Sequence, residues 1–210
     1  MWLRDLLAPR SRNIPVEKSV ILIIADISGY TEFMMSTQTA LLHGQTIINE
    51  LIQSIIEEVR IPLKVAKLEG DAVFLYAAYD NSSRDKTSRQ IGQKLIAFFE
   101  VFSRTLKALE THTHCTCDAC TNISHLRLKV VVHTGSALFY HIGDFLELGG
   151  MDVIIAHRML KNSVTSQEYI LMTEPAFQHI PIPMAVEAYE HEENYPTIGC
   201  LKLRIYPLQD

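Results

Sequence analysis

The feature that most constrains this chain is an uninterrupted apolar run, VILIIA at residues 20–25, which ends abruptly at Asp26. Five of the six residues are β-branched or Leu, and a short run of this composition predicts a strand that is buried on both faces. A carboxylate at the tip of such a strand is costly to bury unless it is paired or holds a metal ion. The run therefore predicts a central strand with a functional candidate, Asp26, at its end.

A turn and the start of a helix follow this strand. Ser28, Gly29, Tyr30 and Thr31 form a segment that can turn the chain and begin a helix. The first N–H groups of a helix have no partner within the helix, so they are available to phosphate oxygens. An acid beside such N–H groups is an arrangement that holds a metal ion and a phosphate together.

A second acid lies at the tip of a predicted hairpin. Residues 63–67 alternate like a strand, Leu-Glu-Gly-Asp at 68–71 turns, and residues 72–76 begin another strand. If the two strands are neighbours, Asp71 lies beside Asp26, and the pair of carboxylates suits Mg²⁺ or Mn²⁺. The alternative is a helix N-cap for Asp26 and a turn residue for Asp71.

The remaining pattern indicates an α+β protein. Apolar residues at helical spacing alternate along the chain with short β-type runs, in the order β-α-β-β-α-β-β-α-β-β. Helices are expected over residues 30–60, 88–109 and 152–161. Strands are expected at 126–132 and 136–140, joined by a turn at Thr134-Gly135, and at 169–172 and 201–206.

Three segments in this order resemble motifs of class III nucleotidyl cyclases. They are ADISGYTEF at 25–33, KLEGDAVF at 67–74, and the stretch from His133-Thr134-Gly135 to AHRML at 156–160. The resemblance spans roughly residues 18–165 and suggests a divergent, bacterial-type member of the superfamily with a Cys/His-rich insertion. It implies a ferredoxin-like, cyclase-type sandwich: a mixed, mostly antiparallel sheet with helices on one face.

The resemblance also implies roles for particular residues. Asp26 and Asp71 would hold Mg²⁺ or Mn²⁺, Lys67 and Glu147 would read the nucleotide base, and Arg158 would be catalytic by stabilising charge on the phosphorus. Glu147 has one methylene more than the Asp of adenylate-forming members. In the family the site lies between two subunits, so a homodimer is expected. The residues expected around the phosphates are Ile27, Ser28, Gly29, Tyr30, Thr31 and Phe33.

One position departs from the family pattern. Ile154 lies four residues before Arg158, on the same helix face, where active cyclases carry an Asn that orients the ribose. An aliphatic side chain cannot donate a hydrogen bond, and the loss of one transition-state donor typically costs ~10²–10³ in rate. The sequence therefore predicts a nucleoside triphosphate-binding domain that forms 3′,5′-cyclic nucleotide and pyrophosphate weakly. The alternative is a catalytically degenerate homologue that acts as a nucleotide- and metal-binding sensor or interaction module.

The insertion at residues 111–122, THTHCTCDACTN, has a chemistry of its own. Three thiols and nearby imidazoles predict a structural Zn²⁺ site. A redox-active loop is the other interpretation, whereas buried inert thiols fit the polar surroundings poorly. The expected ligands are Cys115, Cys117 and Cys120, with one of His112, His114 and His125.

The overall composition argues against two classes of partner, nucleic acids and membranes. The net charge of the 210 residues is −5 and no Lys/Arg cluster stands out, which argues against nucleic acid. No apolar run approaches the ~20 residues that cross a bilayer, and Arg4 and Asp5 interrupt the N-terminal apolar segment, which argues against a secretory signal. We therefore expect a cytoplasmic protein without a membrane partner. An N-terminal helix and linker would occupy residues 1–17, and one domain would occupy residues 18–210.

Overall fold

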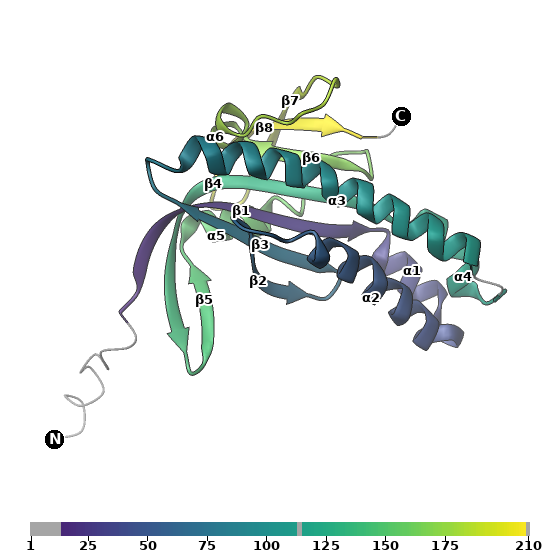
Figure 1. Ribbon diagram of the computed structural model, residues 1–210. Helices are drawn as coiled ribbons and strands as arrows, with labels where there is room; N and C mark the ends of the chain where they lie inside the picture. The colour runs from purple at the N-terminus through teal and green to yellow at the C-terminus, as the bar shows by residue number, and fades with distance from the viewer. Residues whose placement is uncertain (1–13, 113–114, 209–210) are drawn as a thin grey trace.

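One mixed sheet of eight strands organises the protein (Figure 1). The computed structural model describes residues 14–112 and 115–208, and the strand order is β2-β3-β1-β4-β6-β8-β7, with β5 paired to β4 outside this path. The strands are β1 (Val16–Ser28), β2 (Lys64–Glu69), β3 (Ala72–Tyr79), β4 (Arg127–Ile142), β5 (Phe145–Gly149), β6 (Tyr169–Thr173), β7 (Tyr189–Tyr195) and β8 (Gly199–Pro207). The helices are α1 (Tyr30–Ser36), η1 (Gln38–Ala40), α2 (Leu41–Glu57), α3 (Arg84–His112), α4 (Asp118–Asn122), η2 (Ile123–His125), α5 (Met151–Arg158) and α6 (Glu174–His179).

The apolar run identified in the sequence lies in the middle of the sheet. Strand β1 pairs antiparallel with β3 on one side and with β4 on the other. Because side chains alternate along a strand, Ile21 and Ile23 enter one core while Leu22 and Ile24 enter a second core on the opposite face. Burial on both faces, as predicted, explains why the run is continuous rather than alternating.

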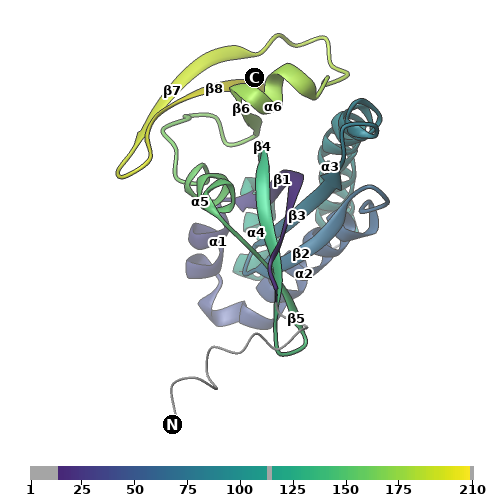
Figure 2. The same cartoon turned by 90° about the vertical axis from the view of Figure 1, so that its left-hand side faces the viewer.

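Helices cover both faces of this sheet, unequally. The long helices α2 and α3 pack over the first core, and α5 packs on the opposite side, where Val153 and Ala156 enter the second core (Figure 2). The α+β sandwich with a mostly antiparallel sheet is confirmed, and β4–β6 is a parallel pair within it. The expectation of helices on one face describes the two long helices but not α5.

The expected turn at Thr134-Gly135 is wrong. Strand β4 continues through both residues and keeps its pairing with β1 as far as Phe139. Gly135 is required by close packing instead, because a methyl group added there would lie 2.2 Å from the carboxyl group of Asp152. The chain reverses later, between β4 and β5, where Ile142 pairs with Phe145.

That carboxyl group ties α5 to β4, and His133 extends the connection to β6. Asp152 Oδ1 lies 2.9 Å from His133 Nε2, and Asp152 Oδ2 accepts a 2.7 Å hydrogen bond from the Ser136 N–H. The other ring nitrogen of His133 lies 2.9 Å from Thr173 Oγ1. His133 is therefore a buried structural residue that links three elements.

The single helix expected over residues 30–60 is interrupted. Its first part is α1, its second is α2, and the buried Thr37 lies between them, where its hydroxyl donates a hydrogen bond to the Met34 carbonyl. Such a local bond competes with the helical pattern. The helix expected over 88–109 lies within α3, whereas β5, β7, α4 and α6 were not anticipated.

The ends of the predicted domain are only partly described. The expected N-terminal helix lies outside the described residues, and β1 already begins at Val16, two residues before the predicted start of the domain. Within the described parts of the chain, no helix is long and apolar enough to cross a membrane.

Replacing Gly135 tests this packing. Gly135→Ala should lower the free energy of unfolding by at least about 2 kcal/mol, because the added methyl group displaces a carboxylate held by two partners. Urea unfolding measures the change. The neighbouring Ser136→Ala keeps the backbone N–H that donates a hydrogen bond to Asp152, so its free energy of unfolding should stay within about 0.5 kcal/mol of the wild type. An equally small effect of Gly135→Ala would contradict the packing described.

Candidate functional site

The two predicted metal-binding aspartates lie at adjacent strand ends. Asp26 is near the end of β1, with its Cα paired to Ala72, the first residue of β3. Asp71 immediately precedes β3, and its carbonyl accepts a 3.4 Å hydrogen bond from the N–H of Ile27. The neighbouring strands thus bring together two acids that are 45 positions apart in the sequence.

A lysine from the third strand contacts this pair. Lys129 of β4 places Nζ 2.9 Å from Asp26 Oδ2, with the two side chains 21% and 15% exposed. Burial alone would lower the pKa of Lys129, but Asp26 opposes it and the pKa is raised, so the side chain is an ammonium ion. Sequence reasoning missed Lys129, because a polar residue that alternates with apolar ones is ordinary in a strand and gives no signal of its own.

The pKa of Asp71 shows that the Lys129 ammonium does not fully neutralise the two carboxylates. Burial, and then the charge of Asp26, raise the pKa of Asp71 from 3.8 to about 6, while its own backbone N–H and Lys129 act in the opposite direction. One ammonium therefore serves two carboxylates. Clustered carboxylate oxygens with excess negative charge fit a divalent cation such as Mg²⁺ or Mn²⁺.

The expected phosphate turn follows Asp26 directly. Gly29 adopts φ 83°, a conformation that favours glycine, and its carbonyl accepts a 2.9 Å bond from the Phe33 N–H as α1 begins. The Ile27 side chain is buried in the first core, so this residue can offer a ligand only its backbone, whereas the Phe33 side chain packs in the same core and also lines the cavity described next. Ser28 and Tyr30 are half-buried and Thr31 is exposed.

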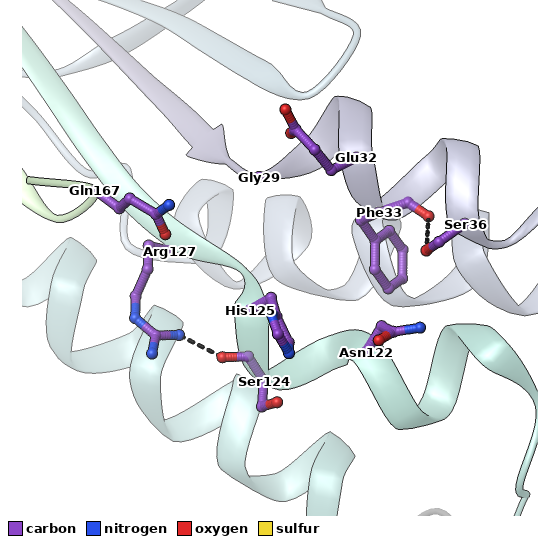
Figure 3. A pocket seen from close by; sticks show the side chains of 9 residues that line it. All are labelled: Gly29, Glu32, Phe33, Ser36, Asn122, Ser124, His125, Arg127 and Gln167. Carbon is purple, nitrogen blue, oxygen red and sulfur yellow. Dashed lines mark hydrogen bonds between the residues drawn. The ribbon is translucent and has the colours of Figure 1, made fainter. Parts of the chain in front are cut away.

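A cavity of about 720 Å³ adjoins this turn (Figure 3). One wall comes from α1 and the other from the segment between α4 and β4. Arg127 is held there by donating to the carbonyls of Ser124 and Leu126, at 2.6 and 2.8 Å. Asp26 and Asp71 do not line this cavity. Its lining residues are Gly29, Glu32, Phe33, Ser36, Asn122, Ser124, His125, Arg127 and Gln167.

The two predicted base-reading residues share a smaller cavity. Lys67 of β2 and Glu147 of β5 line a space of about 200 Å³, together with apolar side chains of β3, β5 and α5. His157 of α5 also lines it, with Nε2 3.1 Å from Glu69. The structure thus brings Lys67 and Glu147 together, and it adds a His157–Glu69 pair that sequence reasoning did not find.

The outer face of α5 carries the other two predicted residues. Ile154 is 49% exposed and Arg158 is exposed, whereas Val153 and Ala156 on the inner face are buried. Neither Ile154 nor Arg158 lines the cavity that contains Lys67 and Glu147. Within one chain, the predicted site residues therefore lie in two places: Lys67 and Glu147 in the smaller cavity, and the other two on the exposed face of α5.

The cysteines of the insertion meet an unexpected histidine. Cys115, Cys117 and Cys120 gather around His43 of α2, and their four ligand atoms lie within 4.8 Å of one another. Of the three histidines expected from the sequence, His125 is outside this group. The side chain of His112 and the whole of His114 lie outside the described residues.

Without a cation, the two thiols of the C-x-x-C pair share one negative charge. The pKa of Cys117 is lowered to about 6, first by a hydrogen bond from the Cys120 backbone N–H and then by His43. The pKa of Cys120 is raised to about 12 by burial and by its hydrogen bonds and charge interactions with the neighbouring sulfurs. Opposite shifts in adjacent thiols are what two groups sharing a proton produce.

The layout of sheet and helices is that of class III adenylyl and guanylyl cyclase domains. The adenylyl cyclase CyaB from P. aeruginosa has a TM-score of 0.65 at 14% identity, covering 93% of this chain and 97% of that chain. The guanylyl cyclase Cya2 gives 0.68 at 10% identity, with 91% and 93% covered. A class III adenylyl cyclase-like ATP-binding protein from Pseudomonas aeruginosa gives 0.63 at 13% identity, with 79% and 35% covered. At such identities the likeness establishes the fold alone.

The chain belongs to the family described as protein of unknown function DUF2652, whose model matches residues 48–169. The uncharacterized protein Rv2561/Rv2562 of Mycobacterium tuberculosis is 34% identical over 131 residues, a match that covers 61% of this chain and 58% of that relative's length. The family segment contains Asp71 and the three clustered cysteines, whereas Asp26 and His43 precede it.

The raised pKa of Asp71 makes stability depend on pH. Because the folded state raises this pKa, the group contributes stability that is present below pH 3.8 and lost as the pH rises through about 6. Relative to Asp71→Asn, which stays neutral, the wild type should lose about 1 kcal/mol between about pH 4 and pH 7, since partial exposure reduces the ceiling set by the shift. Urea unfolding of both proteins at several pH values measures this. A difference that is constant with pH would contradict the raised pKa of Asp71.

Proposed function

We propose that this protein binds a nucleoside triphosphate together with a divalent cation, in a cyclase-type site. The observation that carries the proposal is the pair of acids, Asp26 and Asp71, at adjacent strand ends of a cyclase fold. Mg²⁺ or Mn²⁺ takes few ligands from a protein and several from a nucleotide's phosphates. When bound, such cations neutralise phosphate charge and lower the pKa of an attacking hydroxyl.

The smaller cavity supports recognition of the base. Lys67 carries only donors and Glu147, when ionised, only acceptors, and both line the same space. Together they would match the edge of a purine that presents an acceptor beside a donor. The apolar side chains of Phe74, Leu148 and Val153 in the same cavity would pack against the ring.

A second copy of the chain would complete the site. The β4–β5 hairpin, which extends beyond the rest of the sheet (Figure 1), and the outer face of α5 both carry exposed apolar side chains. Clustered exposed apolar side chains are typical of an interaction site, and Arg158 lies on the same helix face. A protein that stays monomeric by light scattering at tens of micromolar would contradict this homodimer. The apolar residues are Ile142, Phe145, Leu146, Met151 and Ile154.

Turnover to 3′,5′-cyclic nucleotide and pyrophosphate should be weak. Arg158 would stabilise charge on the reacting phosphate, but Ile154, one turn earlier, offers no hydrogen bond to a ribose. That observation also favours the second candidate, a domain that binds nucleotide and metal as a sensor or interaction module without turnover. One of the similar structures is named as a cyclase-like ATP-binding protein, which supports this second candidate.

Incubation with Mn²⁺ and each of the four nucleoside triphosphates separates these functions. Thermal unfolding reports binding, since a ligand that binds the folded state raises the melting temperature, and chromatography reports cyclic product. Asp26→Asn should abolish Mn²⁺-dependent stabilisation, whereas Asp85→Asn, exposed in the first turn of α3, should leave it unchanged. Stabilisation without product supports the binding module. Stabilisation that survives in both Asp26→Asn and Asp71→Asn would refute the metal site.

Replacing Ile154 tests the missing donor. Ile154→Asn should raise kcat by up to about 10²-fold and change KM little, because the restored contact acts mainly in the transition state. The side chain is half exposed, so the amide can be accommodated at modest cost. Val186→Asn, an exposed apolar position between α6 and β7, is the matched control. A wild type that turns over at ordinary enzyme rates and is slowed by Ile154→Asn would contradict the role given to this helix.

A further inference from the structure

Four side chains from two distant segments converge outside the proposed nucleotide site. His43 comes from the first turns of α2, and Cys115, Cys117 and Cys120 come from the insertion, more than seventy positions later in the sequence. We propose that these four residues bind one Zn²⁺ ion, and that the ion fastens the insertion to α2. This proposal is independent of nucleotide binding.

The distances between the four ligand atoms fit a tetrahedral zinc site. With Zn–S near 2.3 Å and Zn–N near 2.0–2.1 Å, a tetrahedron has edges of about 3.8 Å between sulfurs and about 3.6 Å between sulfur and nitrogen. His43 Nδ1 lies 3.6 Å from Cys115 Sγ, 3.4 Å from Cys117 Sγ and 4.0 Å from Cys120 Sγ. Cys117 Sγ lies 3.5 Å from Cys120 Sγ. One ring nitrogen thus faces all three sulfurs at the spacing that a shared ion requires.

The chemistry of the cluster favours an ion over a disulfide. A bond between Cys117 and Cys120 would use two of the four groups and leave Cys115 and His43 facing it without a role. Three thiolates and one neutral imidazole form a tetrahedral donor set typical of structural zinc.

The ion would hold in place a segment that has little structure of its own to stabilise it. Helix α4 has five residues, too few to be stable alone. Its other contacts include the buried Ala119, the packing of Cys120 against the first core, and a 3.2 Å hydrogen bond from Thr39 Oγ1 to Asp118 Oδ2. Because α4 leads into Asn122, Ser124 and His125, the zinc site would fix one wall of the cavity beside α1 (Figure 3).

Metal analysis tests the site directly. Full-length protein purified without added metal should contain about one zinc per chain by mass spectrometry, and Co²⁺ in its place should give the visible absorption of a tetrahedral thiolate site. His43→Ala should weaken zinc affinity by at least about 10²-fold, since changes that only disturb the surroundings of a metal already cost 10–100-fold. His43→Cys, which restores a ligand, should retain the ion. Protease should cut within residues 115–125 after zinc removal, and not before.

Two controls and the wild type keep the test decisive. His125→Ala removes the neighbouring histidine that the sequence suggested, and Cys200→Ser removes the cysteine outside the cluster; both should keep full zinc content. Zinc loss in His125→Ala but not in His43→Ala would overturn the ligand assignment. Protein with no zinc and three freely titrating thiols, or with a Cys117–Cys120 disulfide, would overturn the site. The cobalt spectrum of the wild type tests whether the site binds metal even if a variant fails to fold.

Discussion

Burial of β1 on both faces is the constraint on which the other elements depend. A strand whose odd and even residues both avoid water needs a strand on each side and a helix layer on each face. Strands β3 and β4 satisfy its backbone hydrogen bonds, while α2, α3 and α5 cover its side chains. Where the apolar run ends, the same pairing brings Asp26 beside the start of β3 and beside Lys129. The position of the candidate site is thus a consequence of how the core closes.

Much of this arrangement could be predicted because it is local or periodic. The run at residues 20–25 indicates a doubly buried strand, and the turn at 68–71 indicates a hairpin, so the adjacency of Asp26 and Asp71 needed only one assumption about strand order. Lys67 and Glu147 required the resemblance to cyclases, since neither is distinguished by its surroundings in the sequence. The structure places both in the lining of one cavity, and their role in reading the base stays a prediction.

The features that the sequence could not indicate depend on contacts between residues far apart in the chain. Gly135 looks like a turn residue, but it is a glycine because Asp152, seventeen positions later, lies directly over it. His43 is one exposed histidine on a long amphipathic helix, and nothing nearby in the sequence connects it with cysteines in the insertion. The buried Thr37 likewise marks the break between α1 and α2, and its burial is not apparent from the sequence. In each case a single side chain has a role that only the folded chain assigns.

The pair of Asp26 and Lys129 has a consequence for the kind of ligand this end of the sheet can accept. The ammonium group belongs to β4, so it stays beside the Asp26 carboxylate whatever the salt concentration. A metal ion that binds Asp26 must therefore displace it. A lone cation would compete with the partly buried Lys129 for the carboxylates, which is unfavourable. A cation that arrives with an anion offers the displaced ammonium a new partner. The lysine therefore favours a cation that binds together with an anion over a free cation, because it couples the binding of one charge to that of its opposite.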